Sequence, residues 1–346
     1  DRLLAMPQYA ERYGRHWLDV VRFAQTNGYE RDDEKPLAWQ YRDYVIGSFN
    51  SDKPYDQFIR EQLAGDELDH PTRDSLIATG FFRLGVWDDE PDDRRAAEFD
   101  GLDDMLKTAS ETFMGLTIGC ARCHHHMFDP ISQQDYYELL AFFRNIRYYD
   151  RPRLAHDSAT YLPLADPKEV HRWRSQLATL RTKATQTYQS LTQDLEAAIK
   201  RKKRTTLTDA QKEALSLPDS ERTAEQMSLA REAEKRLQVK REEILEALPE
   251  NDRHSIEVAE GKLKAFESNP PWGKDYALGV RENDATPPTT HVLIRGNAGR
   301  PGEEVAPRFP AVLETTETHL PSIHPFENSS GRRRFLAEWM SSRQHP

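Results

Sequence analysis

The sequence predicts a mainly α-helical protein with an irregular, loop-rich helical domain, an inserted long antiparallel helical hairpin, and a small strand-containing C-terminal segment. Two observations predict this fold class. Apolar residues recur every three or four positions from Val170 to Ile199, which is typical of a long amphipathic helix. Charged residues make up 31% of the 346 residues and hydrophobic residues only 37%, so much of the chain must lie at a surface. We therefore expect three regions, 1–165, 166–268 and 269–346.

The N-terminal region mixes short helical patterns with loops. Tyr55–Leu63 has apolar residues at helical spacing, and Pro54 before it is a helix-start signal. The acidic segment Asp88–Asp93 contains a proline and predicts a solvated loop. Glu111–Gly119 predicts a helix that runs into a glycine turn. Aromatic residues recur through the first 60 positions, which is typical of a hydrophobic core and equally of walls around a flat cofactor.

The second region, 166–268, predicts two helices that pack antiparallel along one apolar stripe. The first helix carries the stripe Val170–Ile199 and ends in the basic run Lys200–Arg204. Thr205–Arg222 is predicted to be a connector, and a second helix is expected over Ala224–Leu248. The basic run either complements the helix dipole or contacts an anionic partner.

The third region, 269–346, is rich in proline, glycine and short β-branched runs. Thr289–Arg295 has the composition of a strand, and Gly296–Pro310 predicts an extended loop. A short helix is expected over Gly331–Ser342. Minor strand content in a mainly helical chain follows from these patterns.

The charge balance disfavours nucleic acid and anionic membranes as partners. The net charge is −10, which disfavours attraction to nucleic acid or to anionic membranes. No apolar run approaches the roughly 20 residues of a bilayer span. We therefore expect no nucleic-acid partner and no membrane-spanning helix.

The strongest signal is a cysteine pair. The only two cysteines stand in the order Cys120-Ala121-Arg122-Cys123-His124, which is the spacing of c-type haem attachment. Two thiols about one helical turn apart can each add to one vinyl group of a haem, and the following imidazole suits its iron. The motif therefore predicts one covalently attached haem c, with His124 as the proximal ligand and the metal ligand.

Two other chemistries use paired cysteines. A thioredoxin-like dithiol normally follows a strand and has no histidine after it, whereas a helix is expected before Cys120. A zinc site would need further ligands, for which His125 and His126 are the candidates. Structural zinc sites normally pair two separated ligand clusters, and the chain has no second cysteine pair. Both alternatives remain open beside the haem hypothesis.

Several blocks around the motif carry a resemblance. The blocks are Gly115–Pro130 with Asp135–Tyr137, Tyr13–Ala24, Tyr41–Ile46 and Glu61–Asp66. Together they resemble the planctomycete-type cytochrome c domain family, over about residues 1 to 150. The resemblance implies a covalent haem in an exported protein, and it names no substrate.

A second resemblance lies near the C-terminus. The opening of the companion domain that usually follows in that family is similar to three pieces of this chain, His291–Asn297, Pro301–Val305 and Pro307. The resemblance implies the order Asp-His-Lys after the proximal histidine. His126 matches this pattern, whereas His125 and Met127 depart from it, which puts a lysine-dependent role in doubt.

Further residues are candidates for the site. Arg22 and Arg42 lie in matched blocks, and a guanidinium suits a haem propionate, although an ion pair with Asp19 or Asp43 is the favoured explanation for each arginine taken singly. His126 is the candidate catalytic residue and is otherwise expected beside the site as a hydrogen-bond partner. Candidates for the sixth iron ligand are Met105, Met114, Met127, His16 and His126, and candidate acid-base groups are Asp19, Asp66 and Asp129.

Three functions are compatible with these patterns. The first is an exported, periplasmic monohaem c-type cytochrome that transfers electrons to a redox partner protein. The second is a haem-dependent oxidoreductase with an open distal iron site that acts on a small molecule, such as a carbohydrate. The third is a structural module whose helical hairpin docks a partner. The absence of a signal peptide at Asp1 leads us to expect a processed or trimmed chain.

Overall fold

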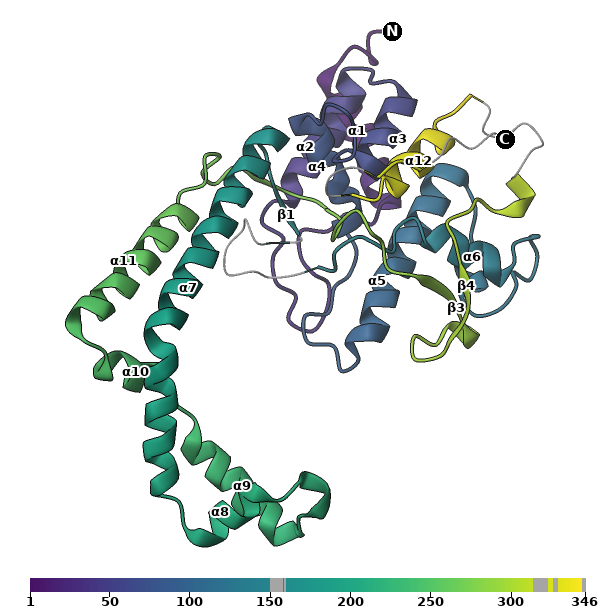
Figure 1. Ribbon diagram of the computed structural model, residues 1–346. Helices are drawn as coiled ribbons and strands as arrows, with labels where there is room; N and C mark the ends of the chain where they lie inside the picture. Colours follow the sequence, from purple (N-terminus) through teal and green to yellow (C-terminus); the bar gives the residue numbers. More distant parts are fainter. Residues whose placement is uncertain (150–157, 159, 314–322, 326–328, 344–346) are drawn as a thin grey trace. The chain divides into compact units, whose positions relative to one another are not determined.

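Helices and two small antiparallel sheets make up the described part of the chain in the computed structural model (Figure 1). The structure describes residues 1–149, 158, 160–313, 323–325 and 329–343. Within these residues the helices are α1 (Pro7–Val20), α2 (Ala38–Asn50), α3 (Tyr55–Ala64), α4 (Arg73–Ala78), α5 (Arg94–Ala109), α6 (Gln133–Leu140), α7 (Pro167–Thr205), α8 (Asp209–Ser216), α9 (Ala224–Leu237), α10 (Arg241–Ala247), α11 (Glu250–Glu267) and α12 (Arg332–Met340). The strands are β1 (Tyr161–Pro163), β2 (Tyr276–Leu278), β3 (Thr290–Leu293) and β4 (Pro301–Val305). The prediction of a mainly α-helical protein with minor strand content is confirmed.

The chain divides into two compact units. The first unit comprises residues 1–167 and 274–346, and the second comprises 168–273. Strand β1 precedes the second unit and β2 follows it, and the two strands pair antiparallel with Tyr161 opposite Leu278. The second unit is therefore inserted between two paired strands of the first.

Local sequence signals explain where several helices begin. Thr72 and Ser132 each accept a hydrogen bond from the backbone N–H three residues on, and each closes a reciprocal capping box. Asp93 accepts from the N–H groups of Arg95 and Ala96 and so caps α5. The predicted acidic loop before α5 is confirmed, and its last residue is the cap.

One hydrophobic core holds the first unit together. Helices α2, α3, α5, α6 and α12 all contribute buried residues to it. Phe309 stacks between Phe142 and Trp339, with ring centroids 5.3 and 3.9 Å away. These stacks bring the C-terminal region into the same core as α6, because large aromatic side chains gain most by leaving water. The sequence predicts a separate segment over 269–346, whereas in the structure residues 274–346 belong to the same compact unit as 1–167.

The C-terminal elements differ in part from expectation. Strand β3 and helix α12 lie where a strand and a helix are predicted. Strand β4 lies inside the predicted extended loop Gly296–Pro310 and pairs antiparallel with β3. Alternating composition alone could not show β4, because Pro301–Val305 has only one apolar residue besides its proline.

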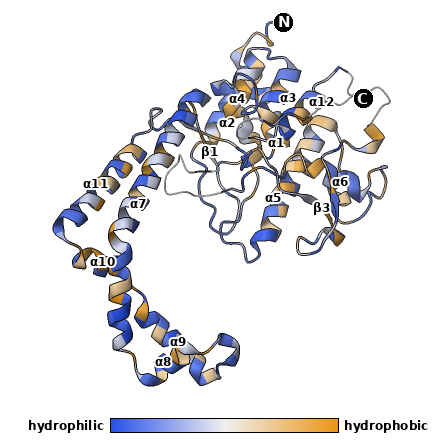
Figure 2. Ribbon diagram, in the orientation of Figure 1, coloured by the Kyte–Doolittle hydropathy of each residue, from blue (hydrophilic) through white to orange (hydrophobic). Residues whose placement is uncertain are grey.

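The second unit consists of α7 and a return path of shorter helices. Apolar residues of α7 pack against Ile244, Leu248 and Ile256 of the returning chain, and these α7 residues are Tyr188, Leu191, Leu195 and Ile199. Trp173 stacks on Phe266, with ring centroids 5.4 Å apart. In Figure 2 these helices are largely hydrophilic, with hydrophobic positions spaced along them. The stripe therefore packs within the unit, as expected.

The prediction of one continuous helix over Ala224–Leu248 is wrong. The structure has α9 and α10 there, and α11 follows from Glu250. Lys240 and Leu248 have extended ψ values of 148° and 145°, which end the helical path on both sides of α10. Pro249 disfavours helical backbone at the residue before it, which accounts for the second break. The predicted connector Thr205–Arg222 also contains a helix, α8.

Every helix in residues 1–149, 160–313 and 329–343 is too short or too polar to cross a bilayer.

Candidate functional site

A short 3₁₀ turn, η3 (Gly119–Arg122), presents the two cysteines. Residues three apart lie on the same side of a 3₁₀ turn. Ile118 and Ala121 form one such pair and are completely buried. Cys120 and Cys123 form the other pair, and both thiols are exposed and unbonded. The buried pair therefore anchors the turn in the core and directs both thiols to solvent.

Arg122, between the cysteines, ties this turn to helices α5 and α6. Its carbonyl oxygen accepts hydrogen bonds from the Gln133 amide at 2.9 Å and from the Tyr137 hydroxyl at 2.9 Å. Its guanidinium pairs with Asp100 at 2.5 Å and Asp103 at 3.4 Å, both on α5. A segment held from two helices keeps the thiols in a defined place, as a covalent cofactor requires.

The imidazole of His124 is exposed, and one nitrogen is engaged. Its Nδ1 lies 2.7 Å from the carbonyl oxygen of His125. A carbonyl can only accept a hydrogen bond, so Nδ1 carries the proton and Nε2 keeps its lone pair. Metal-ligating histidines commonly donate their other N–H to a backbone carbonyl in this way. His124 is thus prepared to bind a metal through Nε2.

The next two histidines use their Nδ1 atoms as acceptors. His125 accepts from the backbone N–H of Gln133 at 3.1 Å. His126 accepts from the N–H of Asp129 at 2.8 Å and from that of Phe128 at 3.3 Å, and its side chain is only 6% exposed. In a neutral ring the remaining Nε2 then carries the proton. His126 holds the following loop, and its catalytic role stays a prediction.

The described residues bear alike on every possible set of metal ligands, including that of the zinc alternative. Within residues 1–149, 158, 160–313, 323–325 and 329–343, no group of three or more His, Cys, Asp or Glu side chains is arranged to hold a metal ion. The site offers two thiols and one imidazole on a surface turn.

Exposed apolar side chains lie next to the motif. Met127 is 75% exposed and Phe128 is 88% exposed, on the loop that follows His124. Large apolar side chains in this state lose contact with water when a flat apolar group covers them. The composition of this surface therefore suits a macrocycle attached at Cys120 and Cys123.

The two predicted arginines have other partners. Arg22 donates through Nε and Nη2 to the carboxylate of Asp104, at 2.8 and 2.6 Å. Arg42 donates through Nε to its neighbour Asp43 at 2.9 Å. The expected ion pair of Arg42 is present, whereas Arg22 pairs with Asp104 instead of Asp19. The contacts of both guanidinium groups lie outside the 120–124 segment, and a propionate role for them stays a prediction.

The other candidate residues are dispersed. Met105 is buried in the core, Met114 is half-buried, and His16 is exposed on α1. Asp66 pairs with Arg333 at 2.8 Å, and Asp129 lies 3.3 Å from Nδ1 of His126. Asp19 is exposed on α1. Three candidates, His126, Met127 and Asp129, follow His124 within five residues of the chain.

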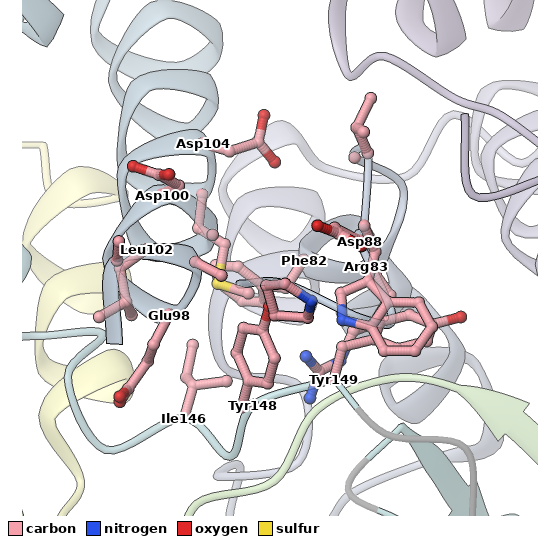
Figure 3. Close-up of a pocket in the computed structure, with 18 of the residues that line it drawn as sticks. Phe82, Arg83, Asp88, Glu98, Asp100, Leu102, Asp104, Ile146, Tyr148 and Tyr149 are labelled. Carbon is pink, nitrogen blue, oxygen red and sulfur yellow. The ribbon is translucent and has the colours of Figure 1, made fainter. Parts of the chain in front are cut away.

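A cavity of about 430 Å³ borders α5 (Figure 3). Its walls include Phe82, Trp87, Tyr148 and Tyr149, and Asp100 and Asp104 reach it from α5. Residues 120–124 are not part of the wall. Asp100 connects the two places, because it lines the cavity and also pairs with Arg122.

Sequence reasoning missed this cavity and the buried Lys35 beside it. The Lys35 ammonium donates to the carbonyl oxygens of Gly85 at 2.5 Å and Leu84 at 3.2 Å. Burial, together with the charge of the nearby Arg22, lowers the pKa of Lys35 from 10.5 to about 8. The cavity aromatics come from segments about 60 residues apart, so only their density along the chain could have indicated a shared wall.

A protein-family model matches the N-terminal part of the chain. Residues 1–148 match the family PSCyt2, described as a protein of unknown function (DUF1549). No curated protein and no solved structure matches the chain. The expected membership of a cytochrome c domain family is therefore wrong, because the family that matches is described as one of unknown function. The haem hypothesis rests on Cys120, Cys123 and His124 themselves.

Proposed function

We propose that this protein binds one haem c covalently through Cys120 and Cys123, with His124 as an axial iron ligand, and that it transfers electrons. The observation that carries the proposal is the arrangement of the motif. Both thiols are exposed, unbonded and on one side of a 3₁₀ turn, and the next residue keeps the lone pair of its Nε2. When bound, the haem supplies a one-electron iron couple.

The residues around the motif support this chemistry in defined ways. The bond from Nδ1 of His124 to the His125 carbonyl orients the imidazole and raises its basicity toward a metal. The bonds to the Arg122 carbonyl prevent the turn from unwinding. Exposed Met127 and Phe128 provide apolar surface beside the thiols.

The location follows from the same chemistry. In bacteria, thioether attachment of haem takes place on the outer side of the cytoplasmic membrane. We therefore propose an exported, periplasmic protein that exchanges electrons with a redox partner.

The decisive experiment is expression of the full chain together with a haem-attachment system. Intact-protein mass should show the addition of one haem, and the pyridine haemochrome spectrum should be that of a two-thioether haem c. Cys120→Ser with Cys123→Ser should abolish the covalent mass. The matched control is Met127→Leu, which leaves thiols and imidazole in place and should keep the haem.

The same experiment separates the competing chemistries. A mass equal to the bare polypeptide would overturn the haem proposal. A protein of that mass in which the two thiols form a reversible disulfide would favour the dithiol alternative. Adding cyanide or carbon monoxide to the loaded protein distinguishes electron transfer from an open-site oxidoreductase, because only an open sixth position binds these ligands promptly.

A further inference from the structure

We infer that the C-terminal turn at Arg295–Gly296 forms part of the haem site, and that Gly296 is the residue that leaves room for the Cys123 thioether. This inference rests on the proposed function. It adds a second segment, about 170 residues further along the chain, to a site that the motif locates at 120–124.

The geometry places Gly296 directly against Cys123. A β-carbon added at Gly296 would lie 2.7 Å from the Cys123 Sγ. It would also lie 3.5 Å from the side chain and 3.5 Å from the carbonyl oxygen of Arg122. A contact of 2.7 Å to sulfur is shorter than side chains tolerate, so any residue except glycine would displace either the sulfur or the turn.

The state of the sulfur decides how severe this conflict is. A free thiol can rotate about χ1 and move away from an added methyl group. A thioether sulfur is bonded to both the cysteine and the macrocycle, so it lacks that freedom. The sulfur contact at Gly296 is therefore a mild constraint in the haem-free chain and a strict one for attachment at Cys123.

The turn holds Arg295 in a left-handed backbone conformation that residues other than glycine disfavour. Arg295 and Gly296 have φ values of 55° and 71°, two consecutive residues in the left-handed region. The Gln133 amide donates both to the Arg122 carbonyl at 2.9 Å and to the Leu293 carbonyl at 3.0 Å, so one side chain joins the motif to the end of β3. Strained backbone that its surroundings hold in place is concentrated at functional sites.

The first test uses the full chain loaded with haem. Gly296→Ala should lower the fraction of protein with two thioethers several-fold. Cys123 should then be recovered as a thiol that iodoacetamide alkylates, and the haemochrome α band should move to longer wavelength because one vinyl group remains. The control is Gly273→Ala, which has a similar φ of 60° and no atom within 4 Å of the added β-carbon. The control should match the wild type.

The second test uses haem-free protein and needs no cofactor. Iodoacetamide should alkylate Cys123 faster relative to Cys120 in Gly296→Ala, because the sulfur is displaced outward. The thermal midpoint should fall less when Gly296→Ala is added to Cys123→Ala than when it is added to the wild type. If Gly296→Ala alone does not fold, the double variant must still fold.

The outcomes are separable. Wild-type protein without haem would overturn the proposed function and, with it, the role of Gly296 in that site. Haem-loaded wild type with an equal two-thioether yield in Gly296→Ala would overturn this inference alone. An unchanged alkylation ratio, or an equal fall of the thermal midpoint in the wild-type and Cys123→Ala backgrounds, would show that Gly296 does not constrain the sulfur.

Discussion

The guanidinium of Arg333 lies 2.7 Å from a carboxylate oxygen of Glu67, and both side chains are completely buried. Arg333 also forms two hydrogen bonds of 2.8 Å with Asp66, and its Nε lies 3.6 Å from Glu282. The Ser329 hydroxyl donates to Glu67 as well. One cation thus joins α12 to the segment after α3 and to the segment after β2.

The first prediction concerns this buried cation. Arg333→Met should lower the free energy of unfolding by roughly 3–5 kcal/mol, because it leaves buried carboxylates without their partner. The control is the neighbouring Arg334→Met. Arg334 pairs with Asp69, which is 68% exposed, so its loss should cost about 1 kcal/mol or less. Chemical denaturation followed by circular dichroism measures both, and equal losses would contradict the prediction.

The second prediction concerns pH. Burial, with the neighbouring carboxylates Asp66 and Glu282, raises the pKa of Glu67 from 4.5 to about 8, although Arg333 opposes this. The folded state therefore holds a proton that the unfolded chain releases above about 4.5. Stability should fall as pH rises from about 4.5 to about 8, by at most about 1.4 kcal/mol per pH unit for this group.

Glu67→Gln isolates that contribution. The variant should show a flatter pH profile of stability than the wild type between pH 4.5 and 8. Glu338→Gln is the matched control, because Glu338 is 44% exposed and should leave the profile unchanged. Glu282 has a lowered pKa, mainly through Arg333 acting against burial, so its contribution has the opposite sign and falls below that window. Parallel profiles for wild type and Glu67→Gln would refute the assignment.

The third prediction concerns His126. His126→Ala removes the acceptor for the N–H groups of Phe128 and Asp129 and should cost about 1 kcal/mol of stability. His126→Asn retains a side-chain acceptor and should recover part of that loss. Neither variant should change the absorption spectrum of haem-loaded protein. A changed spectrum at unchanged stability would instead identify His126 as an iron ligand.

The fourth prediction compares the two arginines. Arg22→Met should cost roughly 1.5–3 kcal/mol, because it breaks a two-pronged, partly buried pair with Asp104. Arg42→Met should cost less than about 0.5 kcal/mol, because its pair with Asp43 is exposed. Thermal melts of haem-free protein give these values. A changed absorption spectrum or reduction potential of the haem-loaded protein in either variant would show a propionate contact.

Some of the fold could be predicted because its causes are local. The stripe Val170–Ile199 indicates a long helix, since its period is a property of neighbouring residues. Helix α3 follows its proline signal, and α12 follows its short apolar pattern. The end of α10 before Pro249 also has a local cause. The prediction missed it because the residues on both sides of Pro249 have helical composition.

Partners distant in the chain could not be predicted in the same way. The sequence offers Asp19 as a nearby partner for Arg22, yet Arg22 pairs with Asp104, 82 residues away. The cavity wall combines the segments near residues 82–88, 96–105 and 146–149. The packing of α5 against these segments determines both the Arg22–Asp104 pair and the cavity wall. The periodicity of the sequence does not indicate which helices pack against each other.

The candidate site shows the same division. The sequence by itself determined that two thiols three residues apart precede an imidazole, because in a tight helical turn that spacing places both sulfurs on one side. Only the tertiary structure decided that Arg122 is held by α5 and α6, and that Gly296 lies against the Cys123 sulfur. The reason is physical, since covalent spacing constrains neighbours in the chain whereas contacts across 170 residues exist only once the core has formed.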